Sequence, residues 1–459
     1  MTTCGFQLFF GKVYSSYSHK WVFLYAFALF KIGPLLCGAA NSSAMFIIGR
    51  AIAGAGGAGI LSGAFIIISE AVSLERRANF SALIWAMYGL ASCSGPLVGG
   101  VFTERVTWRW CFYLNLPVGA LTAVVVIFFL ESYRPSTSVR SLSLRKKLLD
   151  LDPLGSTLFI SAVICLLLAL QYAGTTWAWD SGRIVALLML FGFLLILFGF
   201  LQASLGDNAT WPKQVATQRS MFFGSIFSFC MGASYLIFAF YIPYYLQGIK
   251  NLNPLLAGVG VLPLILGQVG ANLLGGVLVT RIGYYVPFMW LSVVFMAVGS
   301  GLLTTLTRDS SLGKWVGYQI IDGVGIGFGW QQGALAAQTV LDAVDVPVGT
   351  AIAVFMLLFG GAVFVSVANS VFTNSLVREL TAARIVGIDP ATVVHLGATQ
   401  LRQMVSGAEL EAVLDGYMAA LTDVYRVALI LACISAVGVV GMEWIDVRKK
   451  GVKVAGGAA

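Results

Sequence analysis

Charged residues are scarce in this sequence of 459 residues. Only 10% of the positions are Asp, Glu, Lys or Arg, and 58% are hydrophobic, whereas soluble domains carry charge at about 25% of positions. A chain of this composition cannot fold as a globule that faces water on all sides. We therefore expect a protein that uses the lipid bilayer as its solvent, and neither an enzyme nor a nucleic-acid-binding protein.

Histidine is also scarce, and cysteine shows no pattern. His19 and His395 are too few and too far apart for a metal site, and the seven cysteines have no spacing typical of a disulfide framework or a zinc site. The sequence contains no P-loop, so transport driven by ATP is not expected. We expect no cofactor and no metal.

Apolar runs of transmembrane length recur along the whole chain. A helix needs about 20 apolar residues to cross a bilayer. The fold class is therefore all-α and polytopic, with about twelve full spans and a partial first span at residues 2–10. The twelve spans are predicted at residues 22–40, 45–69, 80–102, 111–130, 153–173, 183–203, 221–246, 254–278, 285–305, 316–341, 348–374 and 425–443.

The basic residues indicate how the chain is oriented. The net charge is +8, and Lys and Arg are concentrated in the short loops on one side of the predicted spans. Loops rich in Lys and Arg stay in the cytoplasm, which places the C-terminus inside. The same distribution explains the positive charge without a nucleic-acid partner.

A glycine pattern within the second full span invites a different interpretation. Residues 54–59, GAGGAG, fit the G-x-G-x-x-G fingerprint of dinucleotide-binding folds. The pattern lies inside an apolar run, whereas a nucleotide site needs a strand before it and loops exposed to water. We expect instead a face of small residues that packs against a neighbouring transmembrane helix.

Several longer stretches carry a family resemblance. GLASCSGPLVGG at residues 89–100, the WRWCFYLNLP that follows it and FIIGRA at 46–51 resemble the major facilitator superfamily. The closest likeness is the fourteen-span drug:proton antiporter family, in the fungal branch that includes the HC-toxin and aflatoxin efflux carriers. The likeness runs over nearly the whole chain and implies two helical bundles with an extra helix pair between them.

The stretch at 89–100 is similar to the antiporter motif of drug exporters. Gly95, Pro96, Gly99 and Gly100 match that motif. The glycines are expected to permit tight helix contact, and the proline to bend the helix because it removes a backbone donor. Simple packing is the alternative interpretation.

The inner-loop motif of the superfamily is preserved only in part. A first copy at residues 11–20 keeps Gly11 and Lys20, and a second copy at 276–283 keeps Arg281 and Gly283. A serine and a threonine occupy the two positions where the family has an acid, so a charge-pair latch is not expected at these loops. Two copies so far apart indicate the parallel halves of this fold, which pivot about a site at the midplane.

In the family the antiporter motif lies on span five, but here it lies on the third complete span. This implies that one helix and half of the next are missing upstream. The expected domains are an N-terminal bundle at 1–130, a cytoplasmic amphipathic linker at 131–152, the extra helix pair at 153–203, a cytoplasmic linker at 204–220, a C-terminal bundle at 221–443 with a long outer loop at 375–424, and a cytoplasmic tail at 444–459.

Three charged residues within predicted spans are candidates for the transport or proton path, because ionisable groups in the bilayer usually mark functional paths. Arg50 matches a family motif on a cavity-lining span, with snorkelling to the interface as the alternative. Asp322 is the best remaining intramembrane acid, with contact with water near the outer end as the alternative. Lys31 stands where the family usually has an acid, and Glu70 is a conceivable partner for it.

The substrate cavity is expected to use aromatic and amide side chains from spans that resemble cavity liners. Such groups suit amphipathic molecules with little charge, and ordinary bundle packing is the alternative. The candidates are Gln331, Gln332, Tyr235, Phe240, Tyr241 and Tyr244.

These observations predict a monomeric secondary transporter. It would export a small hydrophobic or amphipathic compound by proton antiport with alternating access, with the plasma membrane as the expected location and the vacuolar membrane as the alternative. A truncated member of the family that no longer transports is the second hypothesis. Import of a siderophore or a sugar is the third, and the antiporter motif argues against it.

Overall fold

The structure is a computed structural model that describes residues 2–131, 152–174, 177–206, 209–382 and 408–448. Within these ranges it is built from helices and contains no β-strand beyond an isolated bridge between Ala173 and Trp177. Ten of the described helices are long and apolar enough to cross a membrane. The all-α, polytopic fold predicted from the sequence is confirmed.

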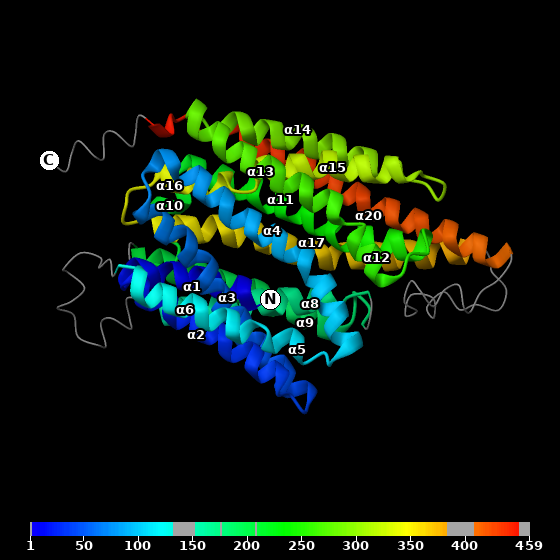
Figure 1. The fold of residues 1–459 in the computed structure, drawn as a ribbon, viewed down its shortest axis with the longest axis horizontal. Helices are drawn as coiled ribbons and strands as arrows, with labels where there is room; N and C mark the ends of the chain where they lie inside the picture. The colour runs from blue at the N-terminus through cyan, green and yellow to red at the C-terminus, as the bar shows by residue number, and fades with distance from the viewer. Residues whose placement is uncertain (1, 132–151, 175–176, 207–208, 383–407, 449–459) are drawn as a thin grey trace.

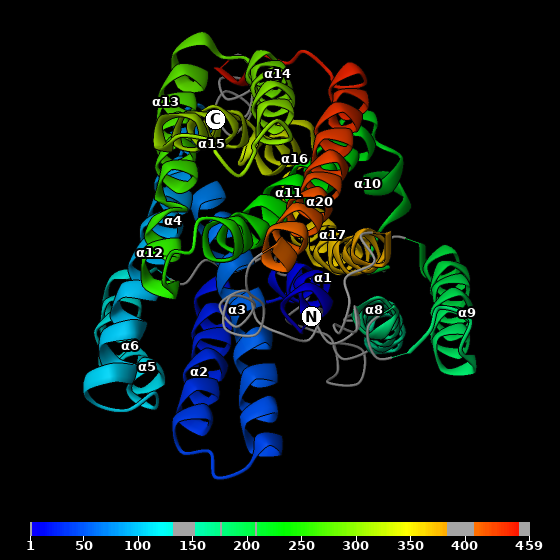
Figure 2. The same ribbon diagram turned by 90° about the vertical axis from the view of Figure 1, so that its right-hand side faces the viewer.

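The N-terminal bundle contains α1 (Thr2–Ser16), α2 (His19–Gly38), α3 (Ser43–Ala71), α4 (Leu74–Arg105), the short α5 (Trp110–Tyr113) and α6 (Asn115–Phe129). Helices α1 and α2 both pack against α3, and Figure 2 shows these helices grouped on one side of the molecule.

Small residues explain the close packing of α3. A Cβ atom added at Gly56 would lie within 3 Å of the backbone of Phe30 on α2, and one added at Gly59 would lie 2.5 Å from the Cβ atom of Ala26. The glycine pattern at 54–59 is therefore a helix-packing face, as predicted, and no strand precedes it.

The C-terminal bundle contains α11 (Arg219–Tyr244), η3 (Tyr245–Ile249), α12 (Pro254–Val259), α13 (Leu262–Ile282), α14 (Val286–Leu303), α15 (Leu312–Gly329), α16 (Gln332–Val340), α17 (Val346–Ala382) and α20 (Ala408–Val440). Helix α11 packs between α17 and α20, and α15 packs between α13 and α14. The largest cluster of buried apolar side chains lies mostly in this bundle and also includes Phe65 of α3 and Trp85 of α4.

Helices α8 (Pro153–Tyr172) and α9 (Gly182–Leu205) form a pair at the position predicted for the extra helices, and the short α10 (Lys213–Thr217) leads into α11. Helix α8 packs against α1 and α17, where the ring centroids of Phe159 and Phe355 are 5.2 Å apart. Helix α9 packs on α8 and leaves most of its apolar surface exposed, as expected for a helix surrounded by lipid. Figure 2 shows α8 beside α17, with α9 at the edge of the molecule.

Two of the twelve predicted spans are not among the ten most apolar helices. Residues 80–102 belong to α4, and residues 316–341 belong to α15 and α16, which are separated by a break at Trp330 and Gln331. Both regions are helical as predicted. Their small and polar residues lower the hydropathy of these helices, which pack against others on several sides.

The predicted outer loop at 375–424 is shorter than expected, because both flanking helices continue into it. Helix α17 extends to Ala382 and α20 begins at Ala408. The start of α20 is held by Arg308, which donates to the carboxylates of Glu411 and Asp415. Residues 383–407 and the predicted amphipathic linker at 132–151 lie outside the described residues.

One end of the molecule contains the helix ends whose loops the sequence analysis assigns to the cytoplasm. Lys20 and Arg76 lie in the first turns of α2 and α4, Arg281 lies in the last turn of α13 and Arg448 follows α20, and we call this end the basic end. Figure 1 shows the helices running along the long axis of the molecule, with α10 and α16 toward one end and α12 toward the other.

The two bundles meet closely at the basic end, through two pairs of helices. On α13, a Cβ atom added at Gly276 would lie 2.8 Å from the Cβ atom of Ala82 on α4. On α1, a Cβ atom added at Gly11 would lie 2.5 Å from the Cβ atom of Ala351 on α17. The two copies of the inner-loop motif therefore provide equivalent contacts between the bundles, one from each half of the chain.

Candidate functional site

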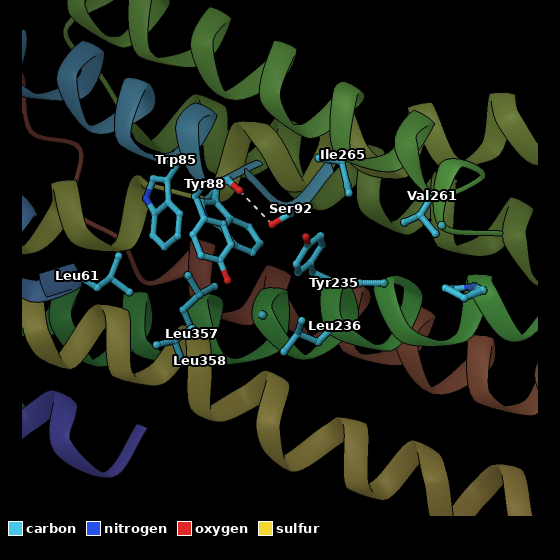
Figure 3. A pocket seen from close by; sticks show the side chains of 15 residues that line it. Leu61, Trp85, Tyr88, Ser92, Tyr235, Leu236, Val261, Ile265, Leu357 and Leu358 are labelled. Atoms are coloured by element: carbon cyan, nitrogen blue, oxygen red, sulfur yellow. Dashed lines mark hydrogen bonds between the residues drawn. The ribbon is translucent and has the colours of Figure 1, made fainter. Parts of the chain in front are cut away.

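A cavity of about 340 Å³ lies between the two bundles. Helices α3 and α4 of the N-terminal bundle form one wall, and helices α11, α12, α13 and α17 form the other with Trp330 (Figure 3). Its volume is at the lower end of the range of small-molecule sites, about 300–1,000 Å³. The lining residues are Leu61, Trp85, Tyr88, Ser92, Gly232, Tyr235, Leu236, Ala239, Pro243, Gly258, Val261, Ile265, Trp330, Leu357 and Leu358.

Aromatic rings from both bundles meet in the wall of this cavity. The ring of Trp330 contacts the ring of Trp85 on α4, with centroids 5.3 Å apart and the planes at 90°. It also contacts Tyr235 on α11, at 4.7 Å and 78°. Trp85 in turn packs edge-to-face on Tyr88, at 5.7 Å. These edge-to-face contacts are favourable for aromatic pairs, and they join α4 to the opposite bundle.

The cavity stands near the middle of the membrane-spanning region. Trp85 is eleven residues into α4, which corresponds to about 16 Å from the basic end of that helix. The hydrocarbon core of a bilayer is about 30 Å thick. Gly258 and Val261, which also line the cavity, lie where the chain enters α13 at the opposite end. The cavity therefore extends from the midplane toward the end opposite the basic one.

None of the lining side chains carries a charge. The hydroxyl of Ser92 donates to the carbonyl oxygen of Tyr88, 3.0 Å away, within its own helix (Figure 3). Among the described residues, no group of three or more His, Cys, Asp or Glu side chains is placed to hold a metal ion. Such a lining suits binding of an apolar or weakly polar molecule.

One of the six aromatic and amide candidates lines the cavity. Tyr235 contributes its ring to the wall, and Trp330 beside Gln331 does the same. Gln331 and Gln332 are buried and are not among the lining residues; the Gln332 amide nitrogen donates to the Phe328 carbonyl oxygen at 2.8 Å.

The three remaining aromatic candidates lie farther along α11. Phe240 and Tyr244 are about half exposed on the outside of the helix, and Tyr241 is buried beside Phe372 of α17. None of the three is among the lining residues of the cavity. They lie on a face of α11 different from that of Tyr235, a difference that a sequence window does not show.

Asp322 is fully buried in α15, away from water. Its Oδ1 atom accepts a hydrogen bond of 2.9 Å from the hydroxyl of Ser300 on α14, and its Oδ2 atom has no partner within the described residues. Gly299 permits this approach, since a Cβ atom there would lie 2.5 Å from the backbone of Asp322. The alternative interpretation, contact with water near the outer end, is wrong. The carboxyl group lies at the α14–α15 contact and does not line the cavity.

Lys31 and Arg50 lie on neighbouring helices of the N-terminal bundle. The Lys31 ammonium on α2 donates to the Asn115 carbonyl oxygen at 2.8 Å and lies 4.8 Å from the ring centroid of Phe27. Arg50, in the second turn of α3, is exposed. Neither residue lines the cavity between the bundles.

Glu70, the partner considered for Lys31, is engaged elsewhere. Its Oε2 atom lies 2.5 Å from Nδ1 of the buried His19, and the other ring nitrogen of His19 lies 2.7 Å from the carbonyl oxygen of Tyr14. The two side chains join the start of α2 to the end of α3 at the basic end.

The antiporter motif on α4 is packed at its start and open farther along. A Cβ atom added at Gly89 would meet Val269 of α13, whereas one added at Gly95 or Gly99 would meet nothing within 4 Å. One added at Gly100 would meet only Leu255, at 3.8 Å. The tight contact predicted for these glycines is therefore absent from this structure, because α4 and α13 contact each other mainly through their basic-end halves. The side chain of Pro96 lies outside what is described.

The remaining gating candidates lie at the basic end. The Lys20 ammonium donates to the carbonyl oxygen of Ile127 at the end of α6. Gly283 has φ +89°, in the left-handed region, and ends α13. Its carbonyl oxygen accepts from the Val447 backbone nitrogen at 2.9 Å.

The segment after α20 packs against the end of α13. The Arg448 guanidinium donates to the carbonyl oxygen of Arg281 at 2.8 Å and to the carboxylate of Asp446. The hydrogen bond with Asp446 raises the pKa of Arg448 above its ordinary value. This segment supplies a charge pair beside an inner-loop motif that itself lacks the acid.

Trp85 and Trp330 are aromatic residues of the cavity wall that were not among the candidates predicted from the sequence. Trp85 stands four residues before the antiporter motif, and Trp330 ends the glycine-rich stretch that contains Asp322. Their proximity to recognised motifs was the available signal. A tryptophan within an apolar run is more often a packing residue. Only the contact between the two rings in the tertiary structure places both residues in the cavity wall.

Comparison with known proteins agrees with this architecture. The family model described as Major Facilitator Superfamily matches residues 1–367. The chain is 46% identical over 449 residues to "Efflux pump aflT" of Aspergillus parasiticus, covering 98% of this chain and 87% of that protein.

Two further similarities extend this agreement. The chain is 46% identical over 453 residues to "Efflux pump hmp6" of Hypomyces subiculosus, covering 98% and 80% of the two chains. Among solved structures, the human organic anion transporter MFSD10 (TETRAN) superimposes with a TM-score of 0.54 at 13% identity, covering 95% of this chain and 81% of that one. At that identity the last similarity concerns the fold alone.

Proposed function

This chain belongs to the major facilitator superfamily, and we propose that it exports a small hydrophobic or amphipathic organic compound by proton antiport. It is an integral membrane protein with many spans. Relatives with 46% identity over nearly the whole chain are named efflux pumps. The observation that supports export of such a compound is the uncharged, aromatic cavity between the two bundles.

The arrangement of the bundles supports alternating access. The bundles pack closely at the basic end through Gly11 and Gly276, and the cavity extends toward the other end. If the basic end faces the cytoplasm, this conformation is closed to the cytoplasm, and substrate would leave toward the outside. A rocking motion about the midplane would then open the basic end to load the next molecule. Both bundles belong to one chain, so a monomer suffices for this cycle.

Proton coupling is proposed to use Asp322. It is an acid within a membrane span, and such residues commonly carry protons in transporters. Because it lies at the α14–α15 contact and does not line the cavity, proton binding would act on the packing of the C-terminal bundle and not by direct contact with substrate.

Arg50 and Lys31 remain the other candidates for the transport path. Arg50 is a charged residue within a membrane span of the N-terminal bundle. A charge in the bilayer is costly in free energy, so such residues usually have a function. Lys31 would act through the contact between α2 and α6, which its hydrogen bond to Asn115 holds.

The plasma membrane is the proposed location.

The proposal is tested by accumulation of a neutral fluorescent dye, Nile red, in yeast cells that lack their own efflux pumps. Cells that produce the protein should retain severalfold less dye than cells with an empty vector, and a protonophore should abolish the difference. The Arg50→Ala variant, at equal surface abundance, should behave as the empty vector does. Equal dye content in all strains would contradict export, and efflux that survives the protonophore would contradict proton coupling.

A further inference from the structure

A second cavity, of about 380 Å³, lies on the side of the C-terminal bundle that carries α10. Its walls come from α10 with the preceding Trp211, from residues 221–229 of α11 and from residues 352–359 of α17. Phe222 in the wall is 56% exposed, so the cavity is a groove that opens on the outer surface of the bundle. Figure 2 shows α10 on that outer side. The groove shares no lining residue with the cavity between the bundles.

The interior of the groove is apolar and nearly as long as one leaflet of a bilayer. The hydroxyl of Ser225 donates to the carbonyl oxygen of Met221 on its own helix, at 2.7 Å, and no lining residue is charged. The wall on α11 extends over residues 221–229, about 12 Å along the helix, and one leaflet of the hydrocarbon core is about 15 Å thick. The rings of Phe229 and Phe359 close the deep end, 5.9 Å apart. A hydrocarbon chain that runs down one leaflet matches the groove in length and polarity.

The mouth of the groove, at the basic end, carries positive charge. Lys213 in α10 and Arg219, the first residue of α11, are exposed, and neither forms an ion pair within the described residues. The Nε atom of Arg219 donates to the Gly441 carbonyl oxygen at 2.8 Å, which holds the guanidinium at this end. The carboxylate of Glu443 accepts from Ser220 at 2.9 Å, on the face of α11 turned away from the groove. The charge offered at the mouth is therefore positive.

Hydrogen bonds hold the wall before α10 in place. The hydroxyl of Thr210 donates to a carboxylate oxygen of Asp152, the residue that caps α8, at 2.9 Å. The backbone nitrogen of Trp211 donates to the side-chain oxygen of Gln202 on α9, also at 2.9 Å. These bonds tie the segment to the neighbouring helix pair, so the groove is a preformed feature of the fold.

We propose that this groove binds an anionic phospholipid of the leaflet at the basic end, with one acyl chain between α11 and α17 and the headgroup beside Lys213 and Arg219. The two cations attract an anion, the uncharged interior accepts hydrocarbon, and Trp211 stands between them, at the depth where tryptophan is favoured. A sterol would fill the interior but offers no anion to the two cations. If the basic end faces the cytoplasm, the site lies in the leaflet that contains the anionic lipids.

Trp211 provides a local reporter, because a brominated acyl chain quenches the fluorescence of a tryptophan that it contacts. The full chain is placed in phosphatidylcholine vesicles in which about a tenth of the lipid is brominated phosphatidylserine or brominated phosphatidylcholine. The signal of Trp211 is the difference between the unmodified protein and Trp211→Phe. Each basic residue near the surface favours an anionic lipid by about fivefold, so brominated phosphatidylserine should quench this signal severalfold more strongly.

The matched control for the reporter is Trp290 of α14, which is 37% exposed and does not line the groove. Its signal, obtained in the same way with Trp290→Phe, should be quenched to similar extents by the two brominated lipids. Size-exclusion profiles of both variants should coincide with that of the unmodified protein.

Variants at the mouth test the headgroup contact. Lys213→Gln and Arg219→Gln should each lower the preference of Trp211 for phosphatidylserine by about fivefold, and the double variant should abolish it. Lys314→Gln is the control, because Lys314 is an exposed lysine of α15 at the opposite end of the molecule. That variant should keep the full preference.

A variant inside the groove tests the position of the acyl chain. Ser225→Phe fills the groove and should reduce the quenching of Trp211 by both brominated lipids. Ser204→Phe is the control, because the Ser204 hydroxyl likewise donates to a carbonyl oxygen of its own helix, that of Phe200 on α9, outside the groove. It should leave the quenching of Trp211 unchanged.

Several outcomes would overturn the proposal. Equal quenching of Trp211 by the two brominated lipids would contradict selection of an anion, and full quenching in Ser225→Phe would remove the acyl chain from the groove. Relief of the quenching by a small fraction of cholesterol would make a sterol the occupant.

A second measurement needs no variant. In native mass spectrometry of the unmodified protein, phosphatidylserine should bind at a lower concentration than phosphatidylcholine with the same acyl chains, and glycerophosphoserine, the headgroup without chains, should not bind. Binding of both phospholipids at equal concentrations would contradict the proposal. None of these measurements requires transport, so their outcome is independent of the dye-efflux assay.

Discussion

At the scale of single residues, burial separates the proton candidate from the substrate cavity. Asp322 is fully buried, with one carboxylate oxygen accepting from Ser300 and the other without a partner in the described part of the chain. An unpaired charge is expensive in such a site. A proton that binds or leaves Asp322 would therefore change the packing of α15 against α14. The effect of proton binding on substrate binding would then be transmitted through the helix packing of the C-terminal bundle.

Replacement of Asp322 by asparagine tests this role. Efflux by the unmodified protein should rise as the outside medium is acidified, because the proton gradient that drives antiport increases. Asp322→Asn keeps the size of the side chain but cannot exchange a proton, so efflux should be roughly independent of pH. The measurement is the initial rate of Nile red efflux between acidic and neutral outside pH.

The matched control for this variant is Asp309→Asn, in the exposed turn before α15. It should keep the pH dependence of the unmodified protein, since its carboxylate lies outside the membrane-spanning helices. A pH profile of Asp322→Asn that coincides with that of the unmodified protein would remove Asp322 from the proton path.

At the scale of helices, glycines set how closely the bundles approach. The α4–α13 and α1–α17 contacts at the basic end depend on Gly276 and Gly11, where an added Cβ atom would be forced against alanine on the opposite helix. Gly95 and Gly99 of the antiporter motif face open space in the same structure. The motif glycines are therefore available for a close contact in another conformation, which is consistent with a motion of α4 relative to α13.

A leucine at Gly276 should disrupt the closed basic end. Overpacking a close contact costs about 1–3 kcal/mol, which shifts a two-state equilibrium roughly tenfold or more. Gly276→Leu should therefore lower efflux by about that factor. It should also accelerate thiol labelling of a cysteine introduced at Ala351 in the α1–α17 contact, measured from the basic side and corrected for the native cysteines.

Gly192→Leu serves as the control for this experiment, because Gly192 lies on α9, outside the contact between the bundles, and its Cβ atom would meet nothing within 4 Å. It should leave the labelling of the cysteine at position 351 unchanged. Unaltered labelling in Gly276→Leu would show that the basic-end contact is not a gate.

At the scale of the whole molecule, the distribution of basic residues among the loops of the sequence is the basis for orientation. Lys20, Arg76, Arg281 and Arg448 lie at one end, and the positive-inside rule places that end in the cytoplasm. This assignment decides which side of the membrane the cavity extends toward in this conformation, because the cavity extends away from the basic end.

Cysteines introduced at two exposed positions test the orientation. Leu312, 67% exposed, begins α15 at the end opposite the basic one, and Val344, 79% exposed, lies between α16 and α17 at the basic end. A maleimide that cannot cross membranes should label Leu312→Cys in intact cells and Val344→Cys only after the cells are permeabilised. The reverse pattern would place the basic end outside, so that this conformation would be closed to the outside and not to the cytoplasm.

Most of the architecture could be read from the sequence. Apolar runs gave the helices to within a few residues, because the bilayer fixes the length and polarity of a span. The ends of α17 and α20 were less predictable. Their continuation beyond the apolar segment depends on contacts such as those of Arg308 with Glu411 and Asp415, which join residues more than 100 positions apart.

The candidate site was also only partly predictable from the sequence. Tyr235 lines the cavity between the bundles, whereas Phe240 and Tyr244 lie on an exposed part of the same helix. Every face of a membrane helix is apolar, because lipid and protein interiors have similar polarity. Hydrophobic periodicity therefore does not tell which face is turned toward a cavity.

The sequence by itself determined the solvent, the helical class and the family, because composition, span length and local motifs are properties of contiguous residues. The tertiary structure alone decided which side chains share a cavity, which glycines bring the bundles together and where Asp322 finds its partner. These depend on contacts between distant helices, such as Trp85 with Trp330 and Gly276 with Ala82. No local pattern encodes such a pair, since its members lie on separate helices that meet only when the two bundles assemble.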